Sequence, residues 1–196
     1  MANYNKVLSA TGLRLGEVRF SYANVLAPRA DNSGKEKYSV QVLVPKKDTQ
    51  AKQFIDAAVE AAIEAGIGTK FNGKRPPASK LKLPLRDGDD EFPDDPTYEG
   101  MWFFNATSST DHRPGVRVLD ERKQMTEALD GDDFYSGCWG AVVVNFYAYN
   151  TSGNMGVAAG LNNIIKTRDA ERLGGGGRTA EQDFSDMTGG GLACLD

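Results

Sequence analysis

The stretch CWGAVVVNFYAY, residues 138–149, is the strongest β-strand pattern in this chain of 196 residues. Successive side chains of a strand point to opposite faces. One face is small or apolar and is expected in the core; it consists of Cys138, Val142, Val144, Phe146 and Ala148. The other face mixes aromatic and polar side chains; it consists of Trp139, Val143, Asn145, Tyr147 and Tyr149. This second face is predicted either to lie open or to be half-covered by a helix or loop.

Two earlier runs alternate in the same way on either side of turn residues. In the first run Val18, Phe20 and Tyr22 are expected on one face. In the second run, residues 37–44, the apolar face consists of Tyr38, Val40, Val42 and Val44. The intervening segment, residues 32–35, reads Asn-Ser-Gly-Lys and is typical of a turn. The two runs are therefore predicted to form a β-hairpin.

One amphipathic helix is predicted after this hairpin. Asp48 is a suitable N-cap residue, and apolar side chains then recur at helical spacing. They are Ala51, Phe54, Ile55, Ala58, Val59, Ala62 and Ile63. Gly66 is predicted to end the helix.

The rest of the chain reads mainly as strands and loops. Residues 81–85 are predicted as a strand with leucines on its inner face and basic residues outside, at an edge or a bulge because of Pro84. Further strands are predicted at 101–106, 116–118 and 155–167, whereas 121–133 is either a short helix or a loop. This pattern predicts an all-β domain with one amphipathic helix, an OB-fold-like barrel of about five to seven strands. A plain β-sandwich remains the alternative.

The net charge of −4 is distributed unevenly along the chain. Residues 1–86 carry 15 basic and 7 acidic side chains, whereas residues 87–99 carry seven acidic side chains and no basic one. Residues 179–196 add four more acidic side chains. A basic first half beside separate acidic segments indicates either a surface for a polyanion or ordinary solvated charge.

Groups for enzymatic chemistry are scarce. The chain has one histidine, His112, and two distant cysteines, Cys138 and Cys194, so it lacks the ligands for zinc and a nucleophile elbow. The acids of residues 87–95 begin like a calcium loop, but Tyr98 stands where an EF-hand needs its closing glutamate. A metal-dependent nuclease using this acidic loop is one alternative function. We expect no enzyme, no cofactor and no metal.

Cellular context follows from the same composition. The longest apolar run is too short to span a bilayer, and the first residues do not resemble a signal peptide. Two unpaired cysteines fit a reducing cytoplasm. We therefore expect no membrane association.

Several separated motifs resemble a family of phage single-stranded DNA-binding proteins, formerly a phage domain of unknown function. They occur in the same order over roughly residues 10–186. The motifs are Leu83-Pro84-Leu85-Arg86-Asp87-Gly88-Asp89, Tyr98-Glu99-Gly100, Asn105-Ala106-Thr107-Ser108, Arg113-Pro114 with Val118 and Asp120, Phe134-Tyr135-Ser136-Gly137-Cys138, Asn145-Phe146-Tyr147-Ala148-Tyr149, and Gly156-Val157 with Gly160-Leu161-Asn162-Asn163. The resemblance implies an OB-fold related to podovirus single-stranded DNA-binding proteins. It also implies sequence-independent binding and protection of single strands in replication and recombination, in the cytoplasm of the infected bacterial host.

The residues expected to contact DNA come from the strand pattern and not from the family. Candidate phosphate contacts are Lys37, Lys80, Lys82, Arg86, Arg113 and Arg117. Candidate base-stacking residues are Trp139, Tyr147 and Tyr149. Each has an ordinary alternative, solvated surface charge for the cations and partial burial for the rings.

The glycine run at residues 174–177 predicts a boundary between a binding domain, residues 1–173, and a flexible acidic tail, residues 174–196. Asp183, Phe184 and Asp186 are candidate contacts of the tail with replication proteins. Tails of this functional class are usually richly acidic and often end in an aromatic residue, whereas this sequence ends in Leu195-Asp196, with Phe184 further inside. The sequence leaves a homodimer open, as it does a virion or scaffold protein that binds no nucleic acid.

Overall fold

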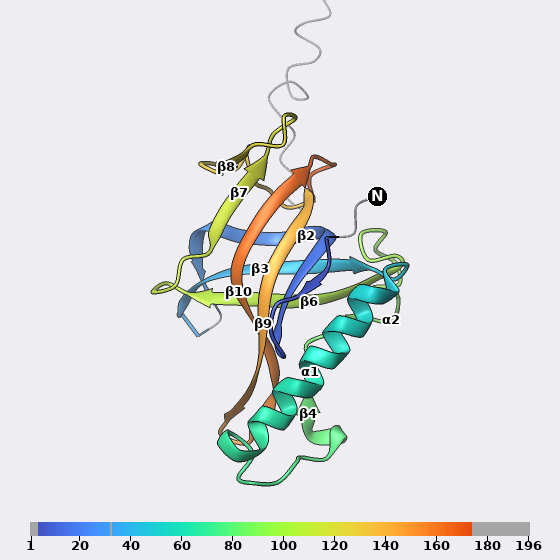
Figure 1. The fold of residues 1–196 in the computed structure, drawn as a ribbon, viewed down its shortest axis with the longest axis vertical. Coiled ribbons are helices and arrows are strands. Elements are labelled where there is room, and N and C mark those ends of the chain that lie inside the picture. Colours follow the sequence, from blue (N-terminus) through green and yellow to red (C-terminus); the bar gives the residue numbers. More distant parts are fainter. Residues whose placement is uncertain (1–3, 32, 174–196) are drawn as a thin grey trace, which may run out of the picture.

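The structure is a computed structural model that describes residues 4–31 and 33–173. Five of its strands close into a barrel (Figure 1). They are β2 (Gly12–Ala30), β3 (Glu36–Pro45), β6 (Met101–Ser109), β9 (Trp139–Thr151) and β10 (Asn154–Arg168). Hydrogen-bonded neighbours follow the order β6-β3-β2-β9-β10, and β10 also pairs with β6 to complete the circle. This five-stranded barrel is of the OB-fold type and confirms the predicted fold, for which the sequence indicated about five to seven strands.

Most pairs within the barrel are antiparallel, but the closing pair is parallel. It sets Ala159 opposite Ala106 and Gly160 opposite Thr107. Five short strands extend the sheet: β1 (Lys6–Val7), β4 (Leu81–Lys82), β5 (Arg86–Asp87), β7 (Gly115–Leu119) and β8 (Met125–Glu127). Of these, β4 and β7 run parallel to β10, so β10 borders four other strands along its length.

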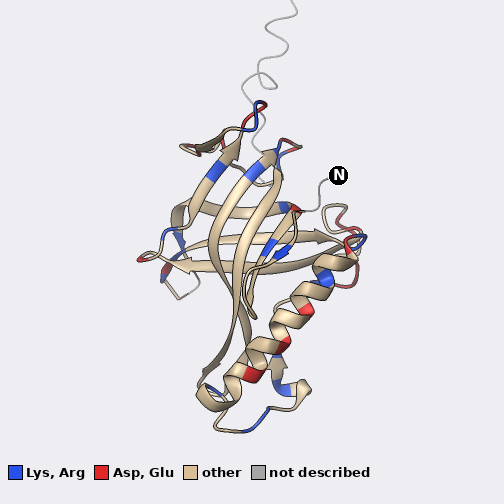
Figure 2. Ribbon diagram, in the orientation of Figure 1, with Lys and Arg blue, Asp and Glu red and all other residues tan. Residues whose placement is uncertain are grey.

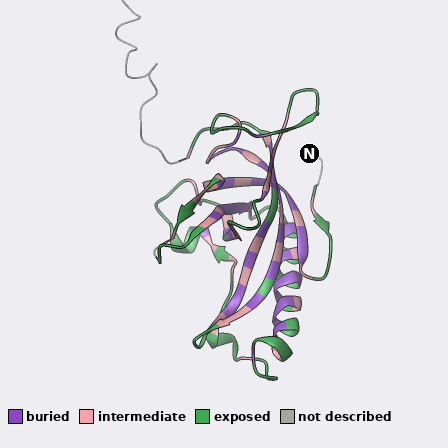
Figure 3. Cartoon of the chain, turned by 90° about the vertical axis from the view of Figure 1, so that its left-hand side faces the viewer, coloured by how far each residue is buried: buried purple, intermediate pink, exposed green. Residues whose placement is uncertain are grey.

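The barrel core confirms the predicted facing of residues 138–149. The five side chains predicted to face inward, Cys138 just before β9 and four within it, are at most 8% exposed, and Tyr147 on the opposite face is 44% exposed. Figure 3 shows the same alternation of buried and more exposed bands along the long strands. Burying one apolar face of each strand is the main stabilising contribution of this core.

Helix α1 (Thr49–Thr69) lies against the lower part of β9 (Figure 1). Asp48 caps it as predicted, accepting a 3.0 Å hydrogen bond from the Ala51 N–H. The predicted apolar stripe is buried except for Phe54, which is half-buried. The prediction that Gly66 ends the helix was wrong. The helix continues past it to Thr69. A Cβ at Gly66 would lie 2.5 Å from Ala148, so glycine is needed here for the close approach to β9.

Two strand predictions also need correction. Residues 81–85 do not form one strand, because only Leu81–Lys82 pairs with β10 and Leu83 is 53% exposed. Tyr22 does not share the buried face of Phe20. The pairing of β2 with β3 shifts between Ser21 and Asn24, and Tyr22 takes a positive φ of 46°. This bulge turns the Tyr22 ring outward and leaves it 68% exposed.

The segment 121–133, left open between helix and loop, contains turns and the short strand β8. The three residues of β8 extend the sheet beyond the barrel, beside β7. Helices η1 (Ala78–Lys80) and α2 (Gly88–Glu91) are single turns. Among the described residues, no helix is both long and apolar enough to cross a membrane.

Candidate nucleic-acid interface

A row of small and polar residues crosses the outer surface of the barrel through strand pairing. It consists of Asn24, Ser39, Thr107, Gly160 and Asn145, from β2, β3, β6, β10 and β9. We call this row the polar belt. The inward neighbours, such as Val40 and Ala106, fill the core, so the belt residues face outward. Asn145 is held in place by the Thr11 hydroxyl, which donates to its Oδ1 at 2.9 Å.

One end of the polar belt opens into a hollow beside Tyr147. This Tyr147 hollow has a volume of about 490 Å³ and lies where β6, β9 and β10 meet. Its wall includes Ser109, His112 and Arg113 from the turn after β6, and Asn162 from β10. The Ser108 hydroxyl donates to the His112 carbonyl at 2.5 Å, which fixes this turn. An exposed aromatic ring and a cation therefore share one open hollow.

The other end of the polar belt opens into a second hollow, beside Tyr22. It also measures about 490 Å³, and its lining includes Asn24, Arg29, Asp95 and Tyr98. Sequence reasoning missed Tyr22 because strict alternation placed it in the core. It also missed Arg29, which lies next to Lys37 across the β2–β3 pair. The signal that could have found Arg29 is its position in the basic first half of the chain.

The six predicted phosphate contacts separate into two groups. Three have a carboxylate partner: Lys37 with Asp31 at 3.1 Å, Arg117 with Glu127 at 3.7 Å, and Arg86 with Glu91. The other three are Lys80, Lys82 and Arg113, which are exposed and make no ion pair within residues 4–31 and 33–173. A phosphate can approach the second group without displacing a carboxylate.

Strand pairing also brings Tyr149 near the segment that follows α1, residues 70–82, which we call the lower basic loop. Tyr149 lies opposite Gly156, and Gly156 lies opposite Lys82, so the three form one row across β9, β10 and β4. A Cβ at Gly156 would be 2.2 Å from the Lys82 carbonyl, so this contact depends on glycine. Figure 2 shows basic residues on this lower loop and acidic residues along the neighbouring helix α1.

Trp139 and Tyr147 share a face but lie at opposite ends of β9. Eight residues of strand separate them by about 26 Å. The Trp139 ring already faces a cation, because the Arg168 guanidinium lies 4.8 Å from its centroid. The structure therefore brings Tyr147 together with Arg113, and Tyr149 together with Lys82, but leaves Trp139 apart from both groups.

The acidic loop is bound to the outside of the barrel. Lys46 donates to Asp87 and, at 2.7 Å, to Asp89, while Arg86 Nε donates to Glu91 at 2.7 Å. The Lys46 ammonium, together with the Gly100 N–H, holds the pKa of Asp89 below its usual value. Among the described residues, no group of three His, Cys, Asp or Glu side chains could hold a metal ion.

Tyr98, which follows the acidic loop, covers part of β3 and β6. Tyr98 and Phe103 are buried together with Leu43 in a small second core. The Tyr98 hydroxyl donates to Gln41 Oε1 at 2.5 Å. This packing leaves the polar belt, and not the whole outer face of β3 and β6, open to a ligand.

The remaining candidate for nucleophilic chemistry is inert. Cys138 is a free thiol with 0% exposure, and burial raises its pKa to about 11. A thiol of this kind is neutral near pH 7 and out of reach of a substrate. Cys194 and the tail residues Asp183, Phe184 and Asp186 lie outside the described residues.

A closed five-stranded barrel with an open polar belt, exposed tyrosines and unpaired cations defines the class of OB-fold binding proteins. Within this class, the chain belongs to the family described as the single-stranded DNA-binding protein of Enterobacter phage Enc34, which it matches over residues 11–191.

Individual relatives agree with this assignment. The chain is 29% identical over 180 residues to a putative protein, p50, of Acyrthosiphon pisum secondary endosymbiont phage 1, covering 90% of this chain and 94% of that protein. The structure resembles the Enc34 protein in complex with single-stranded DNA, with a TM-score of 0.73, 28% identity, and coverage of 89% and 96% of the two chains. A single-stranded DNA-binding protein of bacteriophage T7 shares the fold, with a TM-score of 0.54, 17% identity and coverage of 83% and 93%.

Proposed function

We propose that this protein binds and protects single-stranded DNA without regard to sequence, in phage DNA replication and recombination inside the infected cell. It is not an enzyme. The observation that carries the proposal is the exposed Tyr147 ring in one hollow with Arg113, which has no ion pair among the described residues, beside the polar belt of a chain from this family. An aromatic ring and a cation in one open hollow provide the two interactions that bind a flexible single strand.

The proposed path of the strand runs from the Tyr147 hollow toward the lower basic loop. Arg113 contacts phosphates at the first position, and Lys82 and Lys80 contact them at the second. Tyr147 and Tyr149 stack on bases between these cations, since both face outward from β9. Stacking requires only the face of a base, so any sequence is accepted, whereas the bases of a duplex are stacked on one another and unavailable.

The ion-paired cations have a different role in this proposal. Lys37, Arg86 and Arg117 must each exchange a carboxylate for a phosphate, so they contribute less than an unpaired cation. Trp139 lies about 26 Å along β9 from Tyr147, away from the proposed path. It remains a candidate only for a strand long enough to reach the far end of β9.

Recruitment of replication proteins is proposed for the tail. Its support comes from the sequence, in which Phe184 is flanked by Asp183 and Asp186. Short acidic segments with an apolar anchor suit basic grooves on partner proteins. The division into a binding domain, residues 1–173, and a tail, residues 174–196, is part of the same proposal.

Charge removal at two of the three cations without an ion pair among the described residues tests the binding path. The variants Arg113→Gln and Lys82→Gln are compared with Lys52→Gln, whose side chain is paired with Asp56 on the surface of α1. Each of the first two should reduce the slope of log K against log salt by about 0.7, the value for one phosphate contact on a single strand. Lys52→Gln should leave the slope unchanged. Equal slopes for all three variants would contradict the path.

A further inference from the structure

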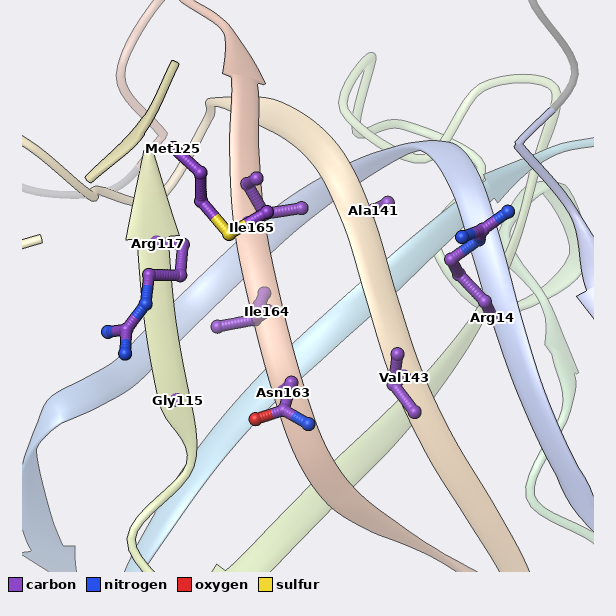
Figure 4. Close-up of a pocket in the computed structure, with 9 residues that line it drawn as sticks. All are labelled: Arg14, Gly115, Arg117, Met125, Ala141, Val143, Asn163, Ile164 and Ile165. Atoms are coloured by element: carbon purple, nitrogen blue, oxygen red, sulfur yellow. The ribbon is translucent and has the colours of Figure 1, made fainter. Parts of the chain in front are cut away.

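A third, mainly apolar hollow lies on the outer sheet face, and the proposed path does not use it. It has a volume of about 290 Å³ and spans four neighbouring strands, β2, β9, β10 and β7 (Figure 4). Its floor is aliphatic and consists of Ala141, Val143, Ile164 and Ile165. Met125, from β8, reaches over this floor toward Ile165 and is 65% exposed. The hollow is therefore an open slot lined by apolar side chains.

Positive charge borders this slot on both sides. Figure 4 shows Arg14 at one edge and Arg117 at the other, with the aliphatic floor between them. Their strands are separated by β9 and β10, which places the two backbones about 14 Å apart. No acidic residue contributes to the lining. The charge pattern suits a ligand that is apolar in the middle and anionic at both ends.

One polar group faces this slot without a partner. The Asn163 side chain makes no hydrogen bond to any residue in the described part of the chain. A Cβ added at Gly115 would lie only 2.6 Å from the Asn163 Oδ1, so glycine at position 115 makes room for the Asn163 side chain. Asn163 follows Asn162 in a β-bulge of β10, and Asn162 lines the Tyr147 hollow. The two hollows therefore adjoin at this bulge.

We propose that this apolar hollow is a second subsite for single-stranded DNA, which holds one unstacked base. The base lies on Val143 and Ile165 under Met125, the Asn163 amide hydrogen-bonds its edge, and Arg14 and Arg117 contact the phosphates on either side. The inference rests on the proposed function, because it extends the same strand from the Tyr147 hollow across the β10 bulge.

Continuity and charge favour DNA over a protein segment in this slot. The slot adjoins the polar belt, so a strand bound at Tyr147 needs only a few nucleotides to reach it. Apolar side chains can hold an extruded base, and guanidinium groups can neutralise the adjacent phosphates. Arg117 is only loosely paired, with Glu127 at 3.7 Å, so a phosphate can replace that contact.

Two matched charge insertions test this subsite. Met125→Glu places a carboxylate over the slot, whereas Leu129→Glu places one at a residue that is 80% exposed and outside the lining. Both sites are exposed, so both variants should fold, and equal melting temperatures check this. With a 20-nucleotide oligo(dT) at low salt, we expect Met125→Glu to bind about tenfold more weakly than the unaltered chain. Leu129→Glu should bind within about twofold of it.

Salt dependence provides the second readout. Arg14→Gln should reduce the slope of log K against log salt by about 0.7 if Arg14 contacts a phosphate. Equal affinities for Met125→Glu and Leu129→Glu, with an unchanged slope for Arg14→Gln, would overturn the subsite. A peptide of residues 179–190 that binds the unaltered chain but not Met125→Glu, with DNA binding unaffected, would also overturn it. Failure of the unaltered chain to bind oligo(dT) would instead contradict the proposed function itself.

Discussion

Alanine at Tyr147 should weaken DNA binding while leaving the fold nearly intact, and alanine at the adjacent Phe146 should do the reverse. The two residues occupy opposite faces of β9. Tyr147 is 44% exposed in the hollow beside Arg113, whereas Phe146 is 1% exposed and its ring centroid lies 5.7 Å from that of Phe104. Adjacent positions on one strand thus provide a matched pair.

The structure sets the expected magnitudes. Phe146→Ala removes a fully buried ring and should lower the free energy of unfolding by about 3–5 kcal/mol. Tyr147→Ala removes a ring with no core contact of this kind and should cost about 1 kcal/mol or less. If the Tyr147 ring stacks on a base, its loss should reduce the binding free energy by about 1–3 kcal/mol, which is about 5- to 150-fold in Kd.

Urea unfolding measures the first quantity, and fluorescence anisotropy with labelled oligo(dT) measures the second. Tyr147→Phe is the control for stacking, because it keeps the ring and should retain most of the affinity. The reasoning fails if Tyr147→Ala destabilises the protein as much as Phe146→Ala does while the affinity per folded molecule stays unchanged.

Three further predictions concern other parts of the molecule. Lys46 and Arg86 lower the pKa values of Asp89 and Glu91, so the stabilisation they provide is present above about pH 4 and lost as pH falls through the lowered values. Trp102 can report the loss of these ion pairs, because its ring centroid lies 4.6 Å from Lys46 Nζ. In a Trp139→Phe background, where Trp102 is the only tryptophan, its fluorescence emission should change as the carboxylates become protonated. A transition near pH 6 would contradict this prediction. Tyr22→Ala should weaken binding of long oligonucleotides more than short ones if the strand follows the polar belt to the second hollow; equal effects at both lengths would remove Tyr22 from the path. Truncation after Leu173 removes the four acidic side chains of residues 179–196 and should tighten binding at low salt, with a gain that shrinks as salt rises. Equal affinity of the full-length and truncated chains at low salt would exclude such competition.

Regular local patterns were enough to predict most of the fold. The two-residue period of β9 gave the correct facing of all its inward residues, and the helix followed from its N-cap and apolar stripe. Both patterns depend on residues close in the chain. The prediction failed where a distant contact decides which residue is needed, as at Gly66, where glycine allows the close approach of Ala148 and does not end the helix.

The site was less predictable for the same reason. Tyr22 faces outward because of a bulge, which no alternation pattern reveals. The difference between Arg113 and Arg86 depends on whether a carboxylate lies nearby in space. Sequence could identify a basic residue beside a strand, but only the three-dimensional arrangement shows that Arg86 is paired with Glu91 and that Arg113 is unpaired among the described residues.

The most direct test of the central claim is a titration of the purified chain with single-stranded and duplex oligonucleotides of the same length, repeated over a range of salt concentrations. We predict tight binding of the single strand regardless of its sequence, much weaker binding of the duplex, and a linear fall of log K with log salt of about 0.7 per phosphate contact. Equal affinity for the two forms, or an affinity for the single strand that does not change with salt, would contradict the account.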